Sequence, residues 1–222
     1  MDKKTMVVVG AGPGLGNHIA KRFGQEGFRV VLMARSERSM NTCRQELTDA
    51  DIEACVFTAD AEDPTSLDAA FEAMRRQGGD PDVLVYNVGI TTPDEPGRMT
   101  AEELVRHFRV DVAGAYHCVH LVADEAFGRR NGAILLTGGG LALWPNAAYL
   151  PLSLDKAGLR AMAFALHEEL KPRGIFLGTV TVCGAIGGDG FFAPGRIAEA
   201  FWTMYTQRGA CECVYAEPNV KP

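Results

Sequence analysis

Short apolar runs alternate with longer helical patterns along the chain, and this alternation constrains the fold more than any other feature of the sequence. Seven runs predict strands: 5–10, 28–34, 52–59, 82–88, 133–138, 175–182 and 210–215. The patterns between them predict helices: 14–26, 36–49, 64–77, 100–127, 152–171 and 195–207. Most strand runs are continuously apolar, which is typical of strands covered on both faces. Strand, helix and strand repeated with short crossovers predict a parallel sheet with helices on both of its faces.

The repeat indicates one doubly wound α/β domain over residues 1–222, with a sheet of about seven parallel strands. Five glycines fall just before a strand, where the end of a helix takes a left-handed residue: Gly27, Gly79, Gly132, Gly174 and Gly209. No linker, low-complexity stretch or internal repeat interrupts the pattern. We therefore expect no second domain.

Composition narrows the classes of partner. The formal net charge of −6 disfavours nucleic acid, which binds a basic face. The apolar run at 6–9 is too short for a secretion signal or a membrane span. The cysteines are Cys43, Cys55, Cys118, Cys183, Cys211 and Cys213. They are scattered, and no histidine pair completes a zinc site, so we expect reduced thiols, no metal, no membrane association and a cytoplasmic location.

A glycine-rich turn follows the first strand, in the stretch VGAGPGLGNHIAKRF. Such a turn places backbone N–H groups and a helix N-terminus against a phosphate group. The spacing G-x-x-x-G-x-G fits at Gly10, Gly14 and Gly16, whereas G-x-G-x-x-G fails because its last position is Leu15. The alternative is a tight turn that binds no ligand. The loop residues expected to bind a dinucleotide are Gly10, Gly12, Pro13, Gly14, Leu15 and Gly16.

The end of the second strand indicates which dinucleotide binds. A free ribose 2′-hydroxyl needs an acidic acceptor about 20 residues after the glycines, but Arg35 stands there with Arg38 close behind. A guanidinium suits a 2′-phosphate, so we expect NADP(H) rather than NAD(H). The alternative is that both arginines are solvated at a helix start. Asp60, after the third strand, is expected to accept from the adenine amino group or to cap a helix, although Asp63 is better placed for capping.

Three later motifs extend the series: YNVG at 86–89, DVAG at 111–114, and Lys156 followed by AGL. With VGAGPGLG and Asp60, they resemble the motifs of the short-chain dehydrogenase/reductase family, namely TGxxxGxG, NNAG, N-V-x-G and an active-site lysine. The resemblance covers nearly the whole chain, from Val7 to about Tyr215. It implies a Rossmann-type fold and a nucleotide-binding cleft.

The resemblance also implies roles for single residues. The glycine loop would bind the pyrophosphate, Asp60 and Ala61 would flank the adenine, and Lys156 would bind the nicotinamide ribose hydroxyls. Ile186 would touch the nicotinamide. The residues expected to line the cleft after the fourth strand are Asn87, Val88 and Gly89.

The family is usually dimeric or tetrameric through its fourth and fifth helices. Here the corresponding helical patterns, 100–127 and 152–171, carry apolar residues around much of their circumference. We therefore expect a homodimer or a homotetramer.

The catalytic set departs from the family's Asn, Ser, Tyr and Lys. Lys156 is present, but Leu152 stands at the tyrosine position, Gly139 at the serine position and Asp111 at the asparagine position. Loss of a positioned general acid typically costs about 10²–10⁴-fold in rate. Loss of an oxyanion donor costs on the order of 10²-fold. We therefore do not expect simple ketone chemistry by the usual route.

Two other routes to catalysis are open. Tyr149 lies seven residues before Lys156, and Pro151 predicts that the helix begins near 150 and leaves Tyr149 in the preceding loop. Its hydroxyl would reach the nicotinamide, or it would serve as a packing aromatic. Alternatively, a quinone accepts hydride to give a stabilised anion that water protonates. The glycines at 138–140 would leave room for such a flat substrate or simply allow close packing.

Other candidates carry no assigned chemistry. Tyr86 is interpreted as a core residue of the fourth strand, and the histidines are interpreted as structural residues. Cys183 lies near the expected nicotinamide position, but the sequence places no histidine to activate it.

Two functions follow from these features. The first is an NADP(H)-dependent oxidoreductase that transfers hydride to a carbonyl- or quinone-type small molecule, with Lys156, Asp111 and Tyr149 as candidate catalytic residues. The second is a catalytically inactive NADP(H)-binding protein that serves as a sensor or interaction partner. The cofactor motifs support both functions, and the missing tyrosine and serine favour the second.

Overall fold

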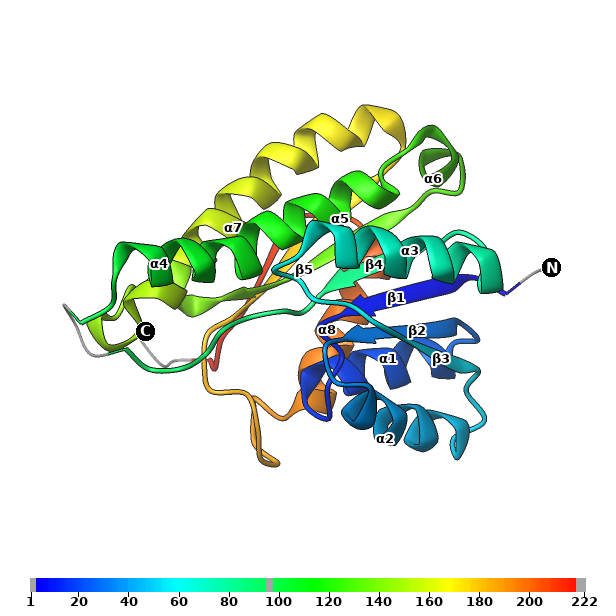
Figure 1. Cartoon of the computed structure of the whole chain (residues 1–222), viewed down its shortest axis with the longest axis horizontal. Coiled ribbons are helices and arrows are strands. Elements are labelled where there is room, and N and C mark those ends of the chain that lie inside the picture. The colour runs from blue at the N-terminus through cyan, green and yellow to red at the C-terminus, as the bar shows by residue number, and fades with distance from the viewer. Residues whose placement is uncertain (1–2, 95–97, 219–222) are drawn as a thin grey trace.

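The computed structural model describes residues 3–94 and 98–218, and in them seven parallel strands form one sheet (Figure 1). Their order is β3-β2-β1-β4-β5-β6-β7. The strands are β1 (Thr5–Val9), β2 (Arg29–Ala34), β3 (Ala54–Thr58), β4 (Val83–Tyr86), β5 (Ala133–Gly139), β6 (Phe176–Val182) and β7 (Glu212–Tyr215). Each strand lies within or beside a predicted run, and the predicted doubly wound, seven-stranded parallel sheet is confirmed.

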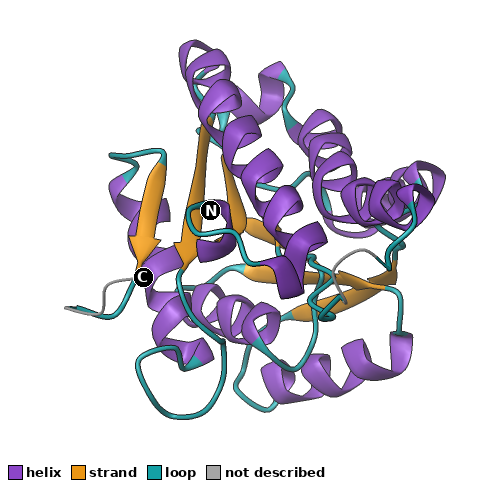
Figure 2. Ribbon diagram, turned by 90° about the vertical axis from the view of Figure 1, so that its left-hand side faces the viewer, coloured by secondary structure: helices purple, strands orange, loops and turns teal. Residues whose placement is uncertain are grey.

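Helices cover both faces of the sheet, as Figure 1 shows and as Figure 2 shows from the side. One face carries α1 (Leu15–Gln25), α2 (Glu37–Thr48) and α8 (Pro194–Gln207). The other face carries α3 (Pro64–Gly78), α4 (Ala101–Phe108), α5 (Gly114–Val122) and α7 (Leu150–Leu170). The short helix α6 (Glu125–Arg129) leads from α5 towards β5.

Burial on both faces explains why the strand runs lack polar alternation. In β1, Met6 and Val8 belong to the hydrophobic cluster under α1, α2 and α8, whereas Val7 and Val9 belong to the cluster under α3, α5 and α7. Successive side chains of a strand point to opposite faces, so the residues of β1 contact the two helix layers alternately. The continuous apolar pattern therefore reflects two cores separated by the sheet.

The predicted helix 100–127 is wrong in one respect, because this segment is not continuous. A π-helical turn, Arg109–Ala113, separates α4 from α5. The Tyr86 hydroxyl, from the end of β4, donates a hydrogen bond to the carbonyl oxygen of Val110 inside this turn. That bond gives the Val110 carbonyl a partner outside the helix, where the regular ladder is interrupted. The helix then ends at Val122, and Asp124 caps the separate α6.

Two of the five predicted left-handed glycines are wrong. Positive φ angles are found at Gly27 (+88°), Gly79 (+82°) and Gly174 (+76°). Before β5 and β7, however, the left-handed residues are Asn131 (+57°) and Arg208 (+49°), each one position before the expected glycine. Gly132 is required for a different reason, since a Cβ there would lie 2.4 Å from Phe127 Cδ1. Gly209 meets no such contact.

The described residues contain no helix with the length and apolar character needed to cross a bilayer.

Candidate functional site

A cleft of about 430 Å³ opens beyond the carboxyl ends of β1, β2, β3 and β4. The sheet order explains its position, because β1 and β4 are neighbours while the chain leaves them in opposite directions, towards β2 and β5. Seven residues predicted to bind the cofactor line this cleft: Gly10, Arg35, Asp60, Ala61, Asn87, Val88 and Gly89. They come from four separate strand ends, so the fold brings together residues up to 79 positions apart.

The contact between the glycine loop and the end of β4 is close. Gly10 has a φ of +86°, and a Cβ there would lie 2.7 Å from both Asn87 C and Val88 N. Residues other than glycine rarely adopt this backbone conformation, and no side chain would fit, so the position requires glycine. Asn87 Nδ2 donates to Gly10 O at 3.1 Å, and Thr137 Oγ1 donates to Asn87 Oδ1 at 2.9 Å. Asn87 thus ties the first loop to the fourth strand and to β5.

The remainder of the glycine loop leads into α1. Cβ atoms at Gly12 and Gly14 would meet nothing within 4 Å, whereas one at Gly16 would lie 2.9 Å from Gly10 O. Pro13 is exposed, and Leu15 is the buried first residue of α1. No side chain caps the N-terminus of α1. Open space beside two glycines and an uncapped helix N-terminus fit a phosphate group.

Two arginines line the outer part of the cleft. Arg35, predicted from the sequence, is exposed, and within residues 3–94 and 98–218 its side chain has no hydrogen bond or ion pair. Arg106, which sequence reasoning missed, reaches the cleft from α4 and pairs with Glu62 at 2.9 Å. Helical periodicity offered no signal for Arg106, because its place over the cleft depends on how α4 packs. Arg38 does not line the cleft.

Asp60 and Asp63 have different roles, as the sequence predicted: Asp63 caps a helix and Asp60 does not. Asp63 is the N-cap of α3 and accepts a hydrogen bond from Thr65 N at 2.9 Å. Asp60 does not cap that helix; its Oδ1 accepts from Glu62 N at 3.0 Å while the residue lines the cleft. The Asp60 carboxylate therefore lines the cleft without capping a helix, and its contact with adenine stays a prediction.

Lys156 and Asp111 lie directly behind Gly89. A Cβ at Gly89 would be 3.4 Å from Lys156 Nζ and 3.5 Å from Asp111 Oδ2. Lys156 Nζ donates to Thr137 O at 3.0 Å, and Asp111 Oδ1 accepts from Ile90 N at 3.0 Å. Burial lowers the pKa of Lys156, although both neighbouring carboxyls raise it. Burial also raises the pKa of Asp111, against the opposing effect of the Lys156 charge.

Two further ionisable residues adjoin this pair, and sequence reasoning missed both. Asp155 is fully buried in α7, and His107 of α4 is nearly so. The distance from His107 Nδ1 to Asp155 Oδ2 is 3.8 Å. Burial first, and Asp111 second, raise the pKa of Asp155 to about 7. A signal was present, since an aspartate precedes Lys156 and a histidine lies one helical turn before Asp111.

The tyrosines occupy different environments. Tyr86 is fully buried, its hydroxyl bonds to Val110 O, and burial raises its pKa well above the usual value, which agrees with a core residue. Tyr149 is half-buried, ends a 3₁₀ turn at Ala147–Tyr149 and is the N-cap of α7, so the helix begins at Leu150, near the start that Pro151 predicted. Leu152, one turn before Lys156, is buried. Tyr149 thus precedes the helix that carries Lys156 and does not line the described cleft, so a catalytic role for its hydroxyl stays a prediction.

The three glycines at 138–140, at and just after the end of β5, are closely packed. A Cβ at Gly138 would lie 2.7 Å from Thr179 Oγ1, one at Gly139 would lie 3.2 Å from Lys156 Cγ, and one at Gly140 would lie 2.9 Å from Cys183 Cα. Protein atoms therefore fill the space that their side chains lack. Of the two open interpretations, close packing is supported, and room for a flat substrate at these glycines is not.

The loop at 183–193 contributes little to the described cleft. Ile186 is 43% exposed and does not line it. The Cys183 thiol donates to Thr181 O at 3.4 Å, and burial raises its pKa, which argues against a thiolate. A nicotinamide contact from Ile186 stays a prediction.

Comparison with known proteins places this geometry in context. The family model for short chain dehydrogenase matches residues 4–188. The 3beta-hydroxysteroid dehydrogenase 1 of Eggerthella lenta is 30% identical over 176 residues, which cover 78% of this chain and 67% of that protein. The 3-oxoacyl-(acyl-carrier-protein) reductase FabG of Escherichia coli is 27% identical over 177 residues, which cover 80% and 71%.

Solved structures show the same architecture. A variant of actinorhodin polyketide ketoreductase with NADPH is 27% identical, with a TM-score of 0.79 over 93% of this chain and 77% of that chain. An alcohol dehydrogenase from Thermococcus sibiricus, complexed with 5-hydroxy-NADP, has a TM-score of 0.85 over 99% and 100%. At 19% identity, the second likeness concerns the fold alone.

Proposed function

The chain belongs to the short-chain dehydrogenase family of oxidoreductases, and from that premise we propose that it binds NADP(H) and transfers hydride to a carbonyl- or quinone-type small molecule. The observation that carries this proposal is the convergence of the glycine loop, Arg35, Asp60 and Asn87 on one cleft, with Lys156 behind Gly89. The similar polyketide ketoreductase binds NADPH, which supports the same cofactor here. In this proposal the whole chain serves as one cofactor-binding domain.

Different residues in and beside the cleft suit different parts of the cofactor. The exposed Arg35 has no carboxylate partner among the described residues, and its guanidinium is available to a 2′-phosphate. The uncapped N-terminus of α1 would hold the pyrophosphate, and Asp60 with Ala61 would flank the adenine. Lys156 would donate to the nicotinamide ribose hydroxyls from behind Gly89. When bound, the reduced nicotinamide supplies the hydride.

Reduction of a carbonyl group by hydride also requires a proton donor near the substrate oxygen. The Lys156 ammonium donates a hydrogen bond to Thr137 O, and the Asp111 carboxyl lies beside it behind Gly89. We assign the donation of a proton to the Tyr149 hydroxyl, because Tyr149 is the N-cap of α7, the helix that carries Lys156. The Ser153 hydroxyl donates a hydrogen bond to the backbone carbonyl of Tyr149 at 2.8 Å and anchors its main chain. The adjoining turn is tied to the segment after β4 by the bond from Asp94 N to Ala148 O at 2.8 Å.

The proposal is tested by following NADPH absorbance with a panel of simple ketones, dicarbonyls and quinones. We expect Tyr149→Phe to reduce carbonyl-dependent NADPH oxidation by about 10²-fold, the lower end of the usual loss of a general acid. NADPH affinity should be unchanged, because the hydroxyl acts on the substrate. Tyr205→Phe, on α8 at the opposite face of the sheet, is the matched control. A fully active Tyr149→Phe protein removes this role, and activity with quinones alone assigns the protonation to water.

A second candidate function is an NADP(H)-binding protein without catalysis, acting as a sensor or interaction partner. The buried Leu152 favours it, since an apolar side chain occupies the helix position one turn before Lys156. The same assay distinguishes the two functions. Tight NADPH binding with no consumption across the panel would support the binder.

We further propose that two or four copies of the chain associate through the face formed by α4, α5 and α7. Six large apolar side chains are exposed on these helices: Val105, Phe108, Tyr116, Leu150, Leu154 and Phe164. Figure 1 shows α4 and α5 following one another in a line, with α7 beside them on the same face of the sheet. Apolar patches of this kind on soluble domains mark interaction surfaces.

A further inference from the structure

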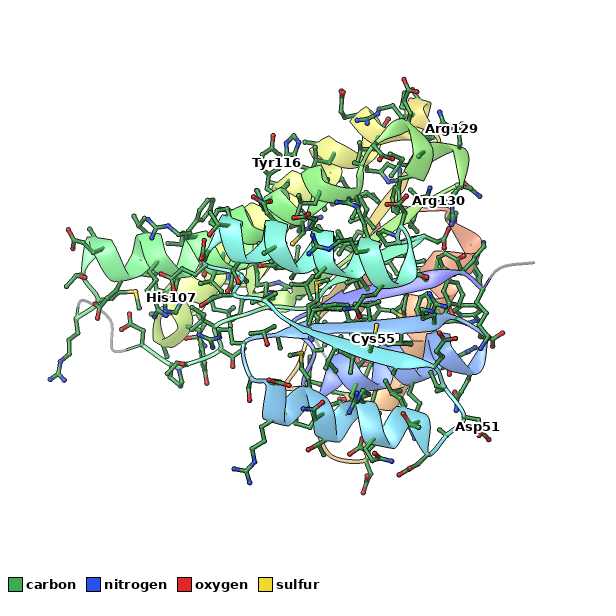
Figure 3. The ribbon with its side chains drawn as sticks, turned by 45° about the vertical axis from the view of Figure 1, so that its right-hand side comes forward. Asp51, Cys55, His107, Tyr116, Arg129 and Arg130 are labelled. Atoms are coloured by element: carbon green, nitrogen blue, oxygen red, sulfur yellow. The ribbon has the colours of Figure 1, made fainter. Side chains whose placement is uncertain are left out.

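Four ionisable side chains are buried together between α4 and α7, behind the cofactor cleft. Asp155 and Lys156 come from α7, His107 comes from α4, and Asp111 comes from the π-helical turn that follows α4. Figure 3 labels His107 on α4. Lys156 and Asp111 adjoin the cleft through Gly89, whereas Asp155 and His107 lie deeper, at the contact between the helices.

Asp155 has no hydrogen-bond donor among the described residues. Both of its carboxylate oxygens are buried without a partner, and so is His107 Nδ1. These two groups face each other at 3.8 Å, which exceeds hydrogen-bond length. A buried carboxylate without donors is costly. The arrangement is therefore favourable only when a proton resides on Asp155 or on His107.

The charges of the cluster lead to the same conclusion. With both carboxyls ionised and His107 neutral, two negative charges would face the single positive charge of Lys156. Burial opposes such an excess and, with Asp111, raises the pKa of Asp155 to about 7. On α4, Glu103 adds an exposed carboxylate on the His107 side. From the segment after β4 and from β5, the described contacts are backbone groups, Ile90 N and Thr137 O.

We propose that Asp155 and His107 are positioning residues that act through Lys156, and that Asp155 takes up a proton from solvent when the reduced dinucleotide binds. This inference rests on the proposed cofactor site. In the step, an O–H bond forms on Asp155, the proton comes from a buffer acid, and no electrons are transferred. With Asp155 neutral, Lys156 faces only the charge of Asp111 and can donate to the ligand.

The redox state of the ligand provides an internal comparison. The oxidised nicotinamide ring is positively charged, so it offsets an ionised Asp155, whereas the neutral reduced ring does not. Proton uptake should therefore be larger for NADPH than for NADP⁺. Both ligands carry the same 2′-phosphate, so the difference between them cancels the titration of that phosphate.

The experiment is calorimetric titration of the full chain with NADPH and with NADP⁺ at pH 7, in phosphate and in Tris, whose ionisation enthalpies differ. We expect an excess uptake of up to about half a proton with NADPH, because a group with a pKa near the pH is about half protonated before binding. Asp155→Asn should abolish this excess, and Asp155→Ala serves if the amide is not tolerated. His117→Gln should retain it, because His117 of α5 pairs with Asp68 of α3, outside the buried cluster.

The outcomes separate this inference from the proposed function. Binding with equal uptake for the two ligands, or an excess that survives in both Asp155 variants, overturns the inference and leaves the cofactor site standing. Absence of binding by either ligand overturns the cofactor site and the inference with it.

Discussion

At the scale of single residues, the neighbours Asp155 and Lys156 differ in how well the sequence predicted them, because Lys156 belongs to a motif and Asp155 is distinguished only by its burial. Seven residues of the cleft were predicted from the sequence, because strand ends and glycine spacing place them there. Asp155 and His107 were not, because their burial depends on how α4 packs on α7. Local patterns carry no information on that contact. The same holds for Arg106, which reaches the cleft only through the position of α4.

The raised pKa of Asp155, from 3.8 to about 7, makes stability depend on pH. Between these values the folded state binds more protons than the unfolded chain, so stability falls as pH rises towards 7. We expect Asp155→Asn to remove this loss, with a gain of at most about 4 kcal/mol at pH 8 and little gain at pH 4. Urea unfolding at both pH values measures it, and an equal effect at both would contradict the raised pKa.

At the scale of elements, the sequence predicted the existence and order of strands and helices better than their interruptions. Continuous apolar runs identified every strand of the described sheet, because both faces are buried. The π-helical turn was missed because its cause is distant in the chain: the bond from Tyr86 to Val110 spans 24 residues. Helix ends were misplaced by one residue at Asn131 and Arg208, where residues other than glycine adopt the left-handed conformation.

Asn131 offers a test of this account of the helix ends. Its φ of +57° costs an ordinary residue about 1–2 kcal/mol, and asparagine less than most. We expect Asn131→Ala to lower the free energy of unfolding by about 1 kcal/mol, and Asn131→Gly to cause no such loss. Thermal unfolding of both variants measures the difference. Equal stability of the two variants would show that the conformation carries no strain.

At the scale of the whole molecule, the cleft and the exposed apolar helix face occupy different parts of the structure. Its carboxyl end holds the cleft, and the helix face of α4, α5 and α7 exposes apolar side chains. The sequence predicted this face from apolar residues around the helices at 100–127 and 152–171. It could not specify two or four subunits, because that number depends on the shape of the joined surfaces. The cytoplasmic location also stays a prediction.

We expect Leu154→Glu to dissociate the assembly, because Leu154 is 46% exposed in the single chain and a charge there would be buried at the interface. Sedimentation velocity should give two or four times the chain mass of 23.9 kDa for the parent and the single mass for the variant. Lys21→Glu, exposed on α1, is the control and should leave the assembly intact. A monomeric parent would contradict this use of the face.

The central claim is that the cleft binds NADP(H) through Arg35, and a fluorescence titration of the protein with NADPH and with NADH tests it most directly. We expect tighter binding of NADPH by about 10–100-fold, the usual worth of a charge-assisted hydrogen bond. Arg35→Asp should abolish this preference, whereas Arg38→Asp, outside the cleft, should retain it. Equal affinities of the parent protein for the two dinucleotides would contradict the claim.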